Sequence, residues 1–212
     1  MNTLQLALNH LSRDPVMKGL IEKLPAPEPG EGAVDPVADV IETIVCQQLS
    51  DKAGATIFGR FEELLKKQGI GFEPEKILLI QDQKVRNCGV SFAKVKCIKS
   101  FCEGVAAGKL NLDKLDLLSD EEVIRELTAV WGIGRWTAEM ILMFTLRRPD
   151  VFSLGDLGLR TAVSQLYFVE RSDLIKIKEI SRQWSPYRSI ASRYLWRSLE
   201  EEAGDDAAVG FG

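Results

Sequence analysis

Histidine and cysteine are scarce in this sequence of 212 residues, and their scarcity excludes several kinds of active site. The one histidine, His10, lies far from any cysteine, which removes the Ser-His and Cys-His mechanisms that need an imidazole base. Cys46, Cys88, Cys97 and Cys102 form no Cys-x-x-Cys pair and are too few and too spread out for a disulfide scaffold. We therefore expect reduced, buried thiols, and neither a zinc nor an iron–sulfur site.

Long apolar runs and an excess of positive charge are missing as well. No run of about 18 apolar residues occurs, and the first residues lack the regions of a signal peptide, so we expect a soluble, intracellular protein with no membrane partner. The compartment would be the cytoplasm or nucleoid in a bacterium and the nucleus in a eukaryote. The sequence contains 27 basic and 31 acidic residues, which gives a net charge of −4. Because the protein as a whole does not attract polyanions, any nucleic-acid site must be local.

Alternating β-strand patterns are absent too, and apolar residues recur at helical spacing almost throughout. N-terminal helix signals are found at several places: Asp35 before Pro36, Ser50, Ser91, and Ser119 with Glu122 as a capping box. Near the end, Ser185 and Pro186 are expected to open a helix, and the acidic tail 200–212 is expected to be frayed. The pattern predicts an all-α fold made of many short helices.

The most informative segment is Trp131-Gly132-Ile133-Gly134-Arg135-Trp136-Thr137-Ala138. Two glycines one residue apart, between two helices, permit a tight hairpin whose backbone N–H groups point outward at the start of the second helix. The helix dipole favours an anion at the same place. In most proteins a Gly-x-Gly pair is only a turn, so the hairpin is a candidate phosphate site that needs support from other residues.

Downstream residues supply that support and make the chain resemble a known family. Residues 147–160, Arg-Arg-Pro-Asp-Val-Phe-Ser-Leu-Gly-Asp-Leu-Gly-Leu-Arg, place Asp156 at the expected start of a helix. Hairpin, loop and aspartate together resemble the helix-hairpin-helix (HhH-GPD) DNA glycosylases, specifically the alkylated-base branch of the DNA-3-methyladenine glycosylase II type. Further matching motifs, which extend the resemblance over most of the chain, are Cys46–Ala53, Gly89–Lys94 and Trp184–Ser189.

The resemblance implies a two-lobed helical fold with a central cleft. One lobe would be formed by both termini, residues 1–35 and 157–212. The other would comprise residues 36–156 and carry the Gln-Gln-Leu-Ser loop, the hairpin and the aspartate loop. Trp131 and Ser153 stand where relatives often have proline, which bears on the shape of these loops.

In that family the aspartate at the position of Asp156 promotes cleavage of the N-glycosidic bond, so Asp156 is the expected catalytic residue. A carboxylate suits this reaction, because departure of a base leaves positive charge on the sugar. The simpler alternative is that Asp156 only caps the helix beginning at Leu157, and the two roles are compatible.

A pocket for a flipped base is also implied. Trp136 stands where lyase-type relatives carry a Schiff-base lysine, which implies a monofunctional hydrolase with water as the acceptor. The expected pocket residues are Trp136, Met140 one turn later, and Tyr187. A cationic methylated purine would gain a cation–π interaction on the tryptophan. The alternative for each of these residues is a core position.

Two further elements are implied to contact DNA. The expected wedge loop, which fills the gap left by the flipped base, consists of Gln47, Gln48, Leu49 and Ser50. Gln48 is the candidate plug, and the alternative is an ordinary interhelical turn. The expected phosphate-binding residues of the hairpin are Gly132, Ile133, Gly134, Arg135 and Thr137. No cofactor is expected, although an alkali-metal ion can occupy the hairpin in relatives.

Together these features predict a monofunctional DNA glycosylase in base excision repair. It would flip alkylated purines, of the 3-methyladenine and 7-methylguanine type, out of duplex DNA and hydrolyse the N-glycosidic bond. The expected partner is double-stranded DNA with alkylated bases, and the expected state is a monomer. Two alternatives stay open: a non-catalytic module of the same fold that binds damaged DNA, and a glycosylase for deaminated or oxidised bases.

Overall fold

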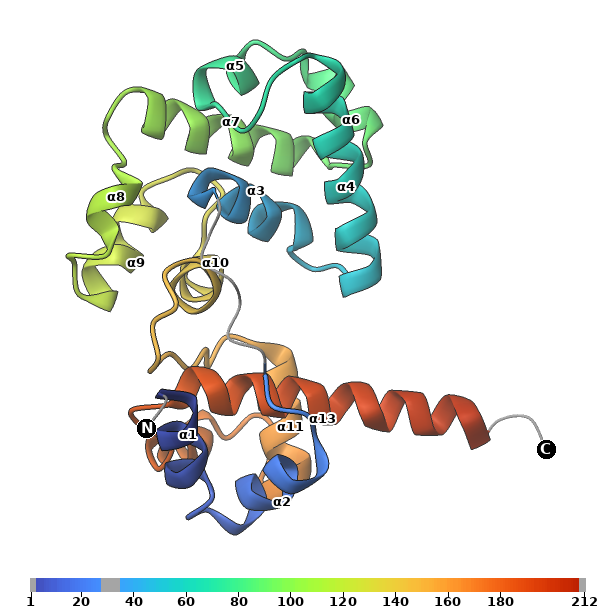
Figure 1. The fold of residues 1–212 in the computed structure, drawn as a ribbon, viewed down its shortest axis with the longest axis vertical. Coiled ribbons are helices and arrows are strands. Elements are labelled where there is room, and N and C mark those ends of the chain that lie inside the picture. The colour runs from blue at the N-terminus through green and yellow to red at the C-terminus, as the bar shows by residue number, and fades with distance from the viewer. Residues whose placement is uncertain (1–2, 28–34, 210–212) are drawn as a thin grey trace. The chain divides into compact units, whose positions relative to one another are not determined.

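Helices and the turns between them make up the part of the chain that the structure describes (Figure 1). The computed structural model describes residues 3–27 and 35–209, apart from the side chains of residue 51 and residues 202–209. Within these ranges no β-strand occurs, and the predicted all-α class is confirmed. The chain divides into two compact units: unit 1 comprises Met1–Gly30 and Arg148–Gly212, and unit 2 comprises Glu31–Arg147.

Unit 1 is built from both ends of the chain. Its helices are α1 (Thr3–Leu11), α2 (Pro15–Lys23), α11 (Leu157–Tyr167), α12 (Leu174–Arg182) and α13 (Arg188–Val209). α13 contacts both α2 and α11, and Trp184 and Tyr194 are the largest side chains buried in the shared core. That core also contains Leu11, Met17, Leu20, Leu159, Val163, Ile177 and Leu195. Burial of apolar side chains from both termini explains why they form one unit.

Asp14 joins the N-terminal helices to the rest of unit 1 through both of its carboxylate oxygens. Oδ1 accepts a hydrogen bond of 2.9 Å from the backbone N–H of Val16 and so caps α2. Oδ2 accepts hydrogen bonds from the Tyr167 hydroxyl (2.6 Å) and the Trp184 indole (3.0 Å). Burial, together with the hydrogen bond to Asp14, raises the pKa of the Tyr167 hydroxyl, which therefore remains a proton donor.

The boundary between unit 2 and the C-terminal part of unit 1 lies earlier in the chain than the sequence predicts. Residues 148–156, which the sequence places in the central lobe, belong to unit 1. The physical reason is Asp150, which forms an ion pair with Arg188 (2.7 Å) and accepts a hydrogen bond from Ser185 (2.7 Å), so the segment is tied to the start of α13. The other boundary, predicted after residue 35, falls between residues 30 and 31, in a segment outside the described ranges.

The C-terminal tail is helical as far as Val209, so the predicted fraying was wrong for residues 200–209, and residues 210–212 lie outside the described residues. Glutamate and alanine are abundant there, and both are strong helix formers. Contacts with the end of α2 also hold α13: Arg197 donates to the Pro25 carbonyl (2.6 Å), and Lys23 pairs with Glu201 (2.9 Å). Helix propensity and these contacts outweigh the acidic composition.

Unit 2 is arranged around α3 (Pro36–Cys46), whose Val40, Ile41, Ile44 and Val45 are all buried. The other helices of unit 2 are α4 (Asp51–Lys67), α5 (Pro74–Leu78), α6 (Asp82–Asn87), α7 (Phe92–Ala106), α8 (Leu112–Leu115), α9 (Asp120–Thr128), α10 (Arg135–Met140) and the π-helix η1 (Ile141–Thr145). α3 contacts α4, α7, α10 and η1. It therefore forms the core against which the hairpin and its helix are placed.

The predicted helix starts of unit 2 are confirmed. Asp35, Ser50 and Ser91 each accept a backbone hydrogen bond from the first turn of α3, α4 and α7. Ser119 and Glu122 form the capping box of α9. These caps satisfy N–H groups that have no partner within the helix.

We expect Asp14→Ala to destabilise the protein strongly. The substitution leaves the Tyr167 hydroxyl and the Trp184 indole without an acceptor, at about 1–3 kcal/mol each, and removes a cap worth about 1 kcal/mol. The free energy of unfolding, measured by urea denaturation, should fall by about 3–7 kcal/mol. Asp173→Ala is the matched control, because Asp173 caps α12 by accepting from Lys176 (2.9 Å); it should cost about 1 kcal/mol. Equal losses would show that the side-chain hydrogen bonds of Asp14 contribute nothing.

Candidate functional site

The two glycines of the hairpin between α9 and α10 serve different purposes. Gly132 has a φ of 89°, in the left-handed region, and a Cβ there would lie 2.8 Å from the Cβ and Sγ of Cys97. Gly134 is the N-cap of α10 with an ordinary φ of −90°, and a Cβ there would meet nothing within 4 Å. Ile133 between them is buried. Gly132 therefore shapes the turn against α7, whereas Gly134 leaves open space before the N-terminus of α10.

Arg135, the first residue of α10, is engaged by acidic side chains. Its Nε donates to Glu139 (2.9 Å) and its Nη2 donates to Glu121 (2.7 Å), so the guanidinium links α10 to α9. The hydrogen bond from Arg135 lowers the pKa of Glu121 and holds it as an anion. Because two carboxylates offset the charge of Arg135, the backbone N–H groups are the part of the hairpin best suited to bind an anion.

The turn between α3 and α4 contains the four predicted wedge residues, and they fall into two groups. Gln48, Leu49 and Ser50 are exposed, and Gln48 has a φ of 58°. Gln47 instead donates from Nε2 to the Oγ1 of Thr137 (2.8 Å), whose side chain is buried. Residues 48–50 thus form the tip of the loop. Gln47 and Thr137 fix its base and join it directly to α10.

Trp136 and Met140 lie four residues apart on α10, at the spacing that places side chains on one side of a helix. Met140 is buried and Trp136 is half-buried. Unit 2 therefore brings together two of the three predicted pocket residues.

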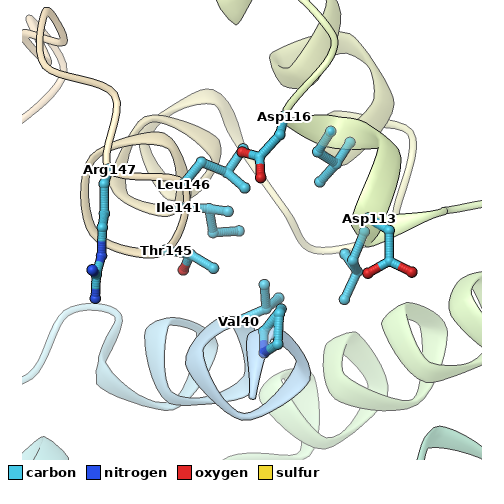
Figure 2. Close-up of a pocket in the computed structure, with 10 residues that line it drawn as sticks. Val40, Asp113, Asp116, Ile141, Thr145, Leu146 and Arg147 are labelled. Atoms are coloured by element: carbon cyan, nitrogen blue, oxygen red, sulfur yellow. The ribbon is translucent and has the colours of Figure 1, made fainter. Parts of the chain in front are cut away.

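A cavity of about 290 Å³ lies elsewhere in unit 2, between α3, α8 and η1 (Figure 2). Val40 and Ile141 contribute apolar surface, and Asp116 and Arg147 contribute charged groups. None of the predicted site residues lines it. The cavity is therefore distinct from the predicted base pocket.

Asp156 is the N-cap of α11 in unit 1, and its carboxylate is firmly held. Oδ1 accepts hydrogen bonds from the backbone N–H of Leu159 (2.7 Å) and from Nε1 of Trp196 (3.0 Å), and only 9% of the residue is exposed. Gly158 permits this approach, because a Cβ there would lie 3.2 Å from both Asp156 Oδ1 and Trp196 Nε1. The capping role is confirmed. The same contacts keep the carboxylate rigid, as a catalytic anion requires.

Tyr187, the third predicted pocket residue, packs within unit 1. Its ring makes an edge contact with the ring of His10, with centroids 5.5 Å apart, and lies against the core cluster. The role of Tyr187 as a pocket residue stays a prediction.

Two residues that shape these features were given no role by the sequence, although Lys94 is the last residue of the matching motif Gly89–Lys94. Trp196 donates to Asp156, and Lys94 donates from Nζ to the backbone carbonyls of Val45 (2.8 Å) and Gln47 (2.6 Å). An indole N–H and an ammonium both need hydrogen-bond acceptors when they are partly buried. A tryptophan or a lysine on a helix that packs against the core is therefore a candidate for such a bond. The sequence does not reveal which partners they find.

The described residues contain no metal-binding cluster, and the two most buried cysteines hold protonated thiols. Among the residues that the structure describes, no group of three or more His, Cys, Asp or Glu side chains could hold a metal ion. Cys88, Cys97 and Cys102 are buried thiols, and burial raises the pKa of Cys97 to about 11 and that of Cys102 to about 12, so these two remain protonated. In the same part of the chain, no helix combines the length and apolar character needed to cross a bilayer.

Comparison with known sequences points to one family. The family described as "HhH-GPD superfamily base excision DNA repair protein" matches residues 41–186. The protein named DNA-3-methyladenine glycosylase 1 from Schizosaccharomyces pombe is 34% identical over 169 residues, which cover 77% of this chain and 72% of that protein.

Solved structures are similar over nearly the whole chain. The S. pombe 3-methyladenine DNA glycosylase Mag1, in complex with abasic DNA, matches with a TM-score of 0.83 and 32% identity, covering 92% of this chain and 96% of that one. A DNA-3-methyladenine glycosidase from Bacillus halodurans matches with a TM-score of 0.75 and 34% identity, covering 93% and 91%.

We expect Gly132→Ala and Gly134→Ala to differ in stability. Alanine at residue 132 must adopt a positive φ and displace Cys97, so the free energy of unfolding should fall by about 2–4 kcal/mol. Alanine at residue 134 meets open space, and the loss should be about 0.5–1 kcal/mol, the usual difference between N-cap residues. Chemical denaturation of both variants measures the difference. Similar losses would contradict the role assigned to the contact between Gly132 and Cys97.

Proposed function

This chain belongs to the HhH-GPD superfamily of base excision DNA repair proteins, and on this basis we propose that it is a monofunctional DNA glycosylase that excises alkylated purines from duplex DNA. The observation that carries the proposal is the Asp156 carboxylate, which is 9% exposed and held by the N–H groups of Leu159 and Trp196. The names of the similar proteins favour 3-methyladenine as a substrate, and 7-methylguanine, another cationic methylated purine, is proposed on the same chemical ground.

The reaction needs a fixed anion beside the sugar. As the N-glycosidic bond breaks, its electron pair leaves with the base and C1′ of the deoxyribose becomes positively charged. The Asp156 carboxylate stabilises this charge until a water molecule bonds to C1′ and loses a proton. A methylated, cationic base leaves as a neutral molecule, so no general acid has to protonate it. This agrees with a chain that contains a single histidine.

Trp136 and Met140 supply the proposed surface for the extruded base. Stacking of a base on an aromatic side chain contributes about 1–3 kcal/mol. The positive charge of a methylated purine adds a cation–π interaction of about 0.5–2 kcal/mol, which a normal base lacks. Because residue 136 is not a lysine, the reaction forms no Schiff base there and ends with water as the acceptor.

The hairpin and the wedge loop provide the proposed contacts with DNA. Backbone N–H groups at the start of α10 bind a phosphate, and the tip formed by residues 48–50 fills the gap left by the extruded base. The bond between Gln47 and Thr137 keeps these two elements at a fixed spacing. In this proposal the protein acts as a monomer on double-stranded DNA, and the chemistry requires no cofactor.

Asp156→Asn tests the proposal, because the amide oxygen can still accept the N–H of Leu159 while the charge is lost. We expect the single-turnover release of 7-methylguanine from methylated duplex DNA to slow by about 10²–10³-fold. Asp173→Asn, at the N-cap of α12 in the same unit, is the control and should keep the wild-type rate.

An unchanged rate in Asp156→Asn would remove this residue from the mechanism. Tight binding of methylated duplex without release by the wild type would instead indicate a non-catalytic module. Duplexes that carry one deaminated or oxidised base, used in the same assay, test the remaining alternative substrate.

Trp196→Phe tests how strictly the carboxylate must be held. The change removes the indole N–H that donates to Asp156 Oδ1 and keeps an aromatic ring. At saturating enzyme we expect base release to slow about tenfold, which corresponds to the loss of one hydrogen bond to a charged group. Trp131→Phe, which alters an indole that is 48% exposed, is the control and should stay within about twofold of the wild type. Equal rates for both variants would show that the indole N–H has no part in positioning Asp156.

A further inference from the structure

Lys94, near the start of α7, occupies the C-terminal end of α3. Its Nζ donates hydrogen bonds to the carbonyls of Val45 (2.8 Å) and Gln47 (2.6 Å). The last four carbonyls of a helix lack partners within it, and the helix dipole makes this end negative. One ammonium group therefore satisfies a carbonyl of α3 and a carbonyl of the wedge loop. Lys94 is half-buried, and desolvation lowers its pKa.

The loop that Lys94 holds is strained at the next residue. Gln48 has a φ of 58°, a region that residues other than glycine rarely adopt and that persists only where neighbours fix it. The fixing contacts are the bond from Lys94 to the Gln47 carbonyl, the bond from Gln47 to Thr137 (2.8 Å), and a backbone hydrogen bond from Leu49 (3.1 Å). Lys94 is the charged member of this set.

We propose that Lys94 is a positioning residue for base extrusion: it fixes the backbone of Gln47 so that residues 48–50 are preorganised to fill the gap in the duplex. This role rests on the proposed function, and Lys94 acts through the loop without contacting the reacting atoms. The consequence is specific. Without Lys94, extruding a base from an intact duplex becomes harder, whereas cleavage of a base that is already unstacked proceeds as before.

The same helix supplies a matched control, Lys99. Its Nζ donates to the carbonyl of Ile80 (2.8 Å) and pairs with Asp82. Lys99 is thus another half-buried lysine that binds a backbone carbonyl, but its partners follow α5 instead of α3. Loss of either lysine should reduce stability, and only Lys94 contacts the wedge loop.

The experiment compares Lys94→Met, Lys94→Arg and Lys99→Met on two substrates. One is a duplex with a single 7-methylguanine opposite cytosine, and the other carries the same nucleotide in a short mismatched bubble, where extrusion requires little work. Lys94→Met should lower the single-turnover rate about tenfold on the duplex and about twofold or less on the bubble. Lys94→Arg, which keeps the charge and the donors, should recover most of the duplex rate. Lys99→Met should match the wild type on both.

Equal losses on the two substrates, or the same pattern in Lys99→Met, would overturn the proposal. If Lys94→Met does not fold, Lys94→Gln, which keeps a neutral donor, enters the same comparison. Failure of the proposed function looks different, because the wild type then releases no base from either substrate. If the wild type releases no base, the hydrogen-exchange rate of the Leu49 amide still tests whether Lys94 holds the loop. Lys94→Met must raise this rate, and Lys99→Met must leave it unchanged.

Discussion

A nearly buried carboxylate is the constraint on which the rest of the structure depends. An anion with 9% of its surface exposed is costly unless hydrogen-bond donors replace the water it has lost. Asp156 finds its donors in the N–H of Leu159, at the N-terminus of α11, and in the indole of Trp196. Both complement a negative charge. The contacts that allow Asp156 to be buried are therefore the same ones that aim it, and the helix cap and the proposed catalytic group are one feature.

Unit 2 faces a different constraint, because the two turns proposed to contact DNA contain residues in the left-handed region of φ. Gly132 and Gln48 have φ values of 89° and 58°. A residue of α7 supports each turn. Cys97 packs against Gly132, and Lys94 donates a hydrogen bond to the carbonyl of Gln47, the residue before Gln48. These two supports lie three residues apart, within one turn of one helix. A rigid helix positions such turns more accurately than another loop would, which explains why an apparently ordinary segment matters to the site.

Local chemistry made the helix starts of unit 2 predictable, whereas α13 begins at Arg188 instead of at Ser185 and Pro186, and contacts between distant residues could not be predicted. An N-cap such as Asp35 involves only the next few residues, so its signal is complete within the sequence. The pair of Trp196 and Asp156 spans 40 residues, that of Lys94 and Gln47 spans 47, and the ion pair that moves the unit boundary spans 38. No short pattern encodes such partners. The candidate site itself came from a family resemblance, and only the structure separates Gln47, an anchor, from the exposed tip of its loop.

Electrostatics explains how a chain of net charge −4 is suited to a polyanionic partner. The charge of Arg135 is offset by Glu121 and Glu139, so the proposed phosphate contact relies on backbone N–H groups and the helix dipole instead of a basic surface. The proposed lesion, in contrast, is itself a cation. A cationic base calls for an aromatic surface such as Trp136 and a negative charge such as Asp156, and it leaves without an acid to protonate it. Because the substrate brings the positive charge, one histidine and a surplus of acidic residues are compatible with this chemistry.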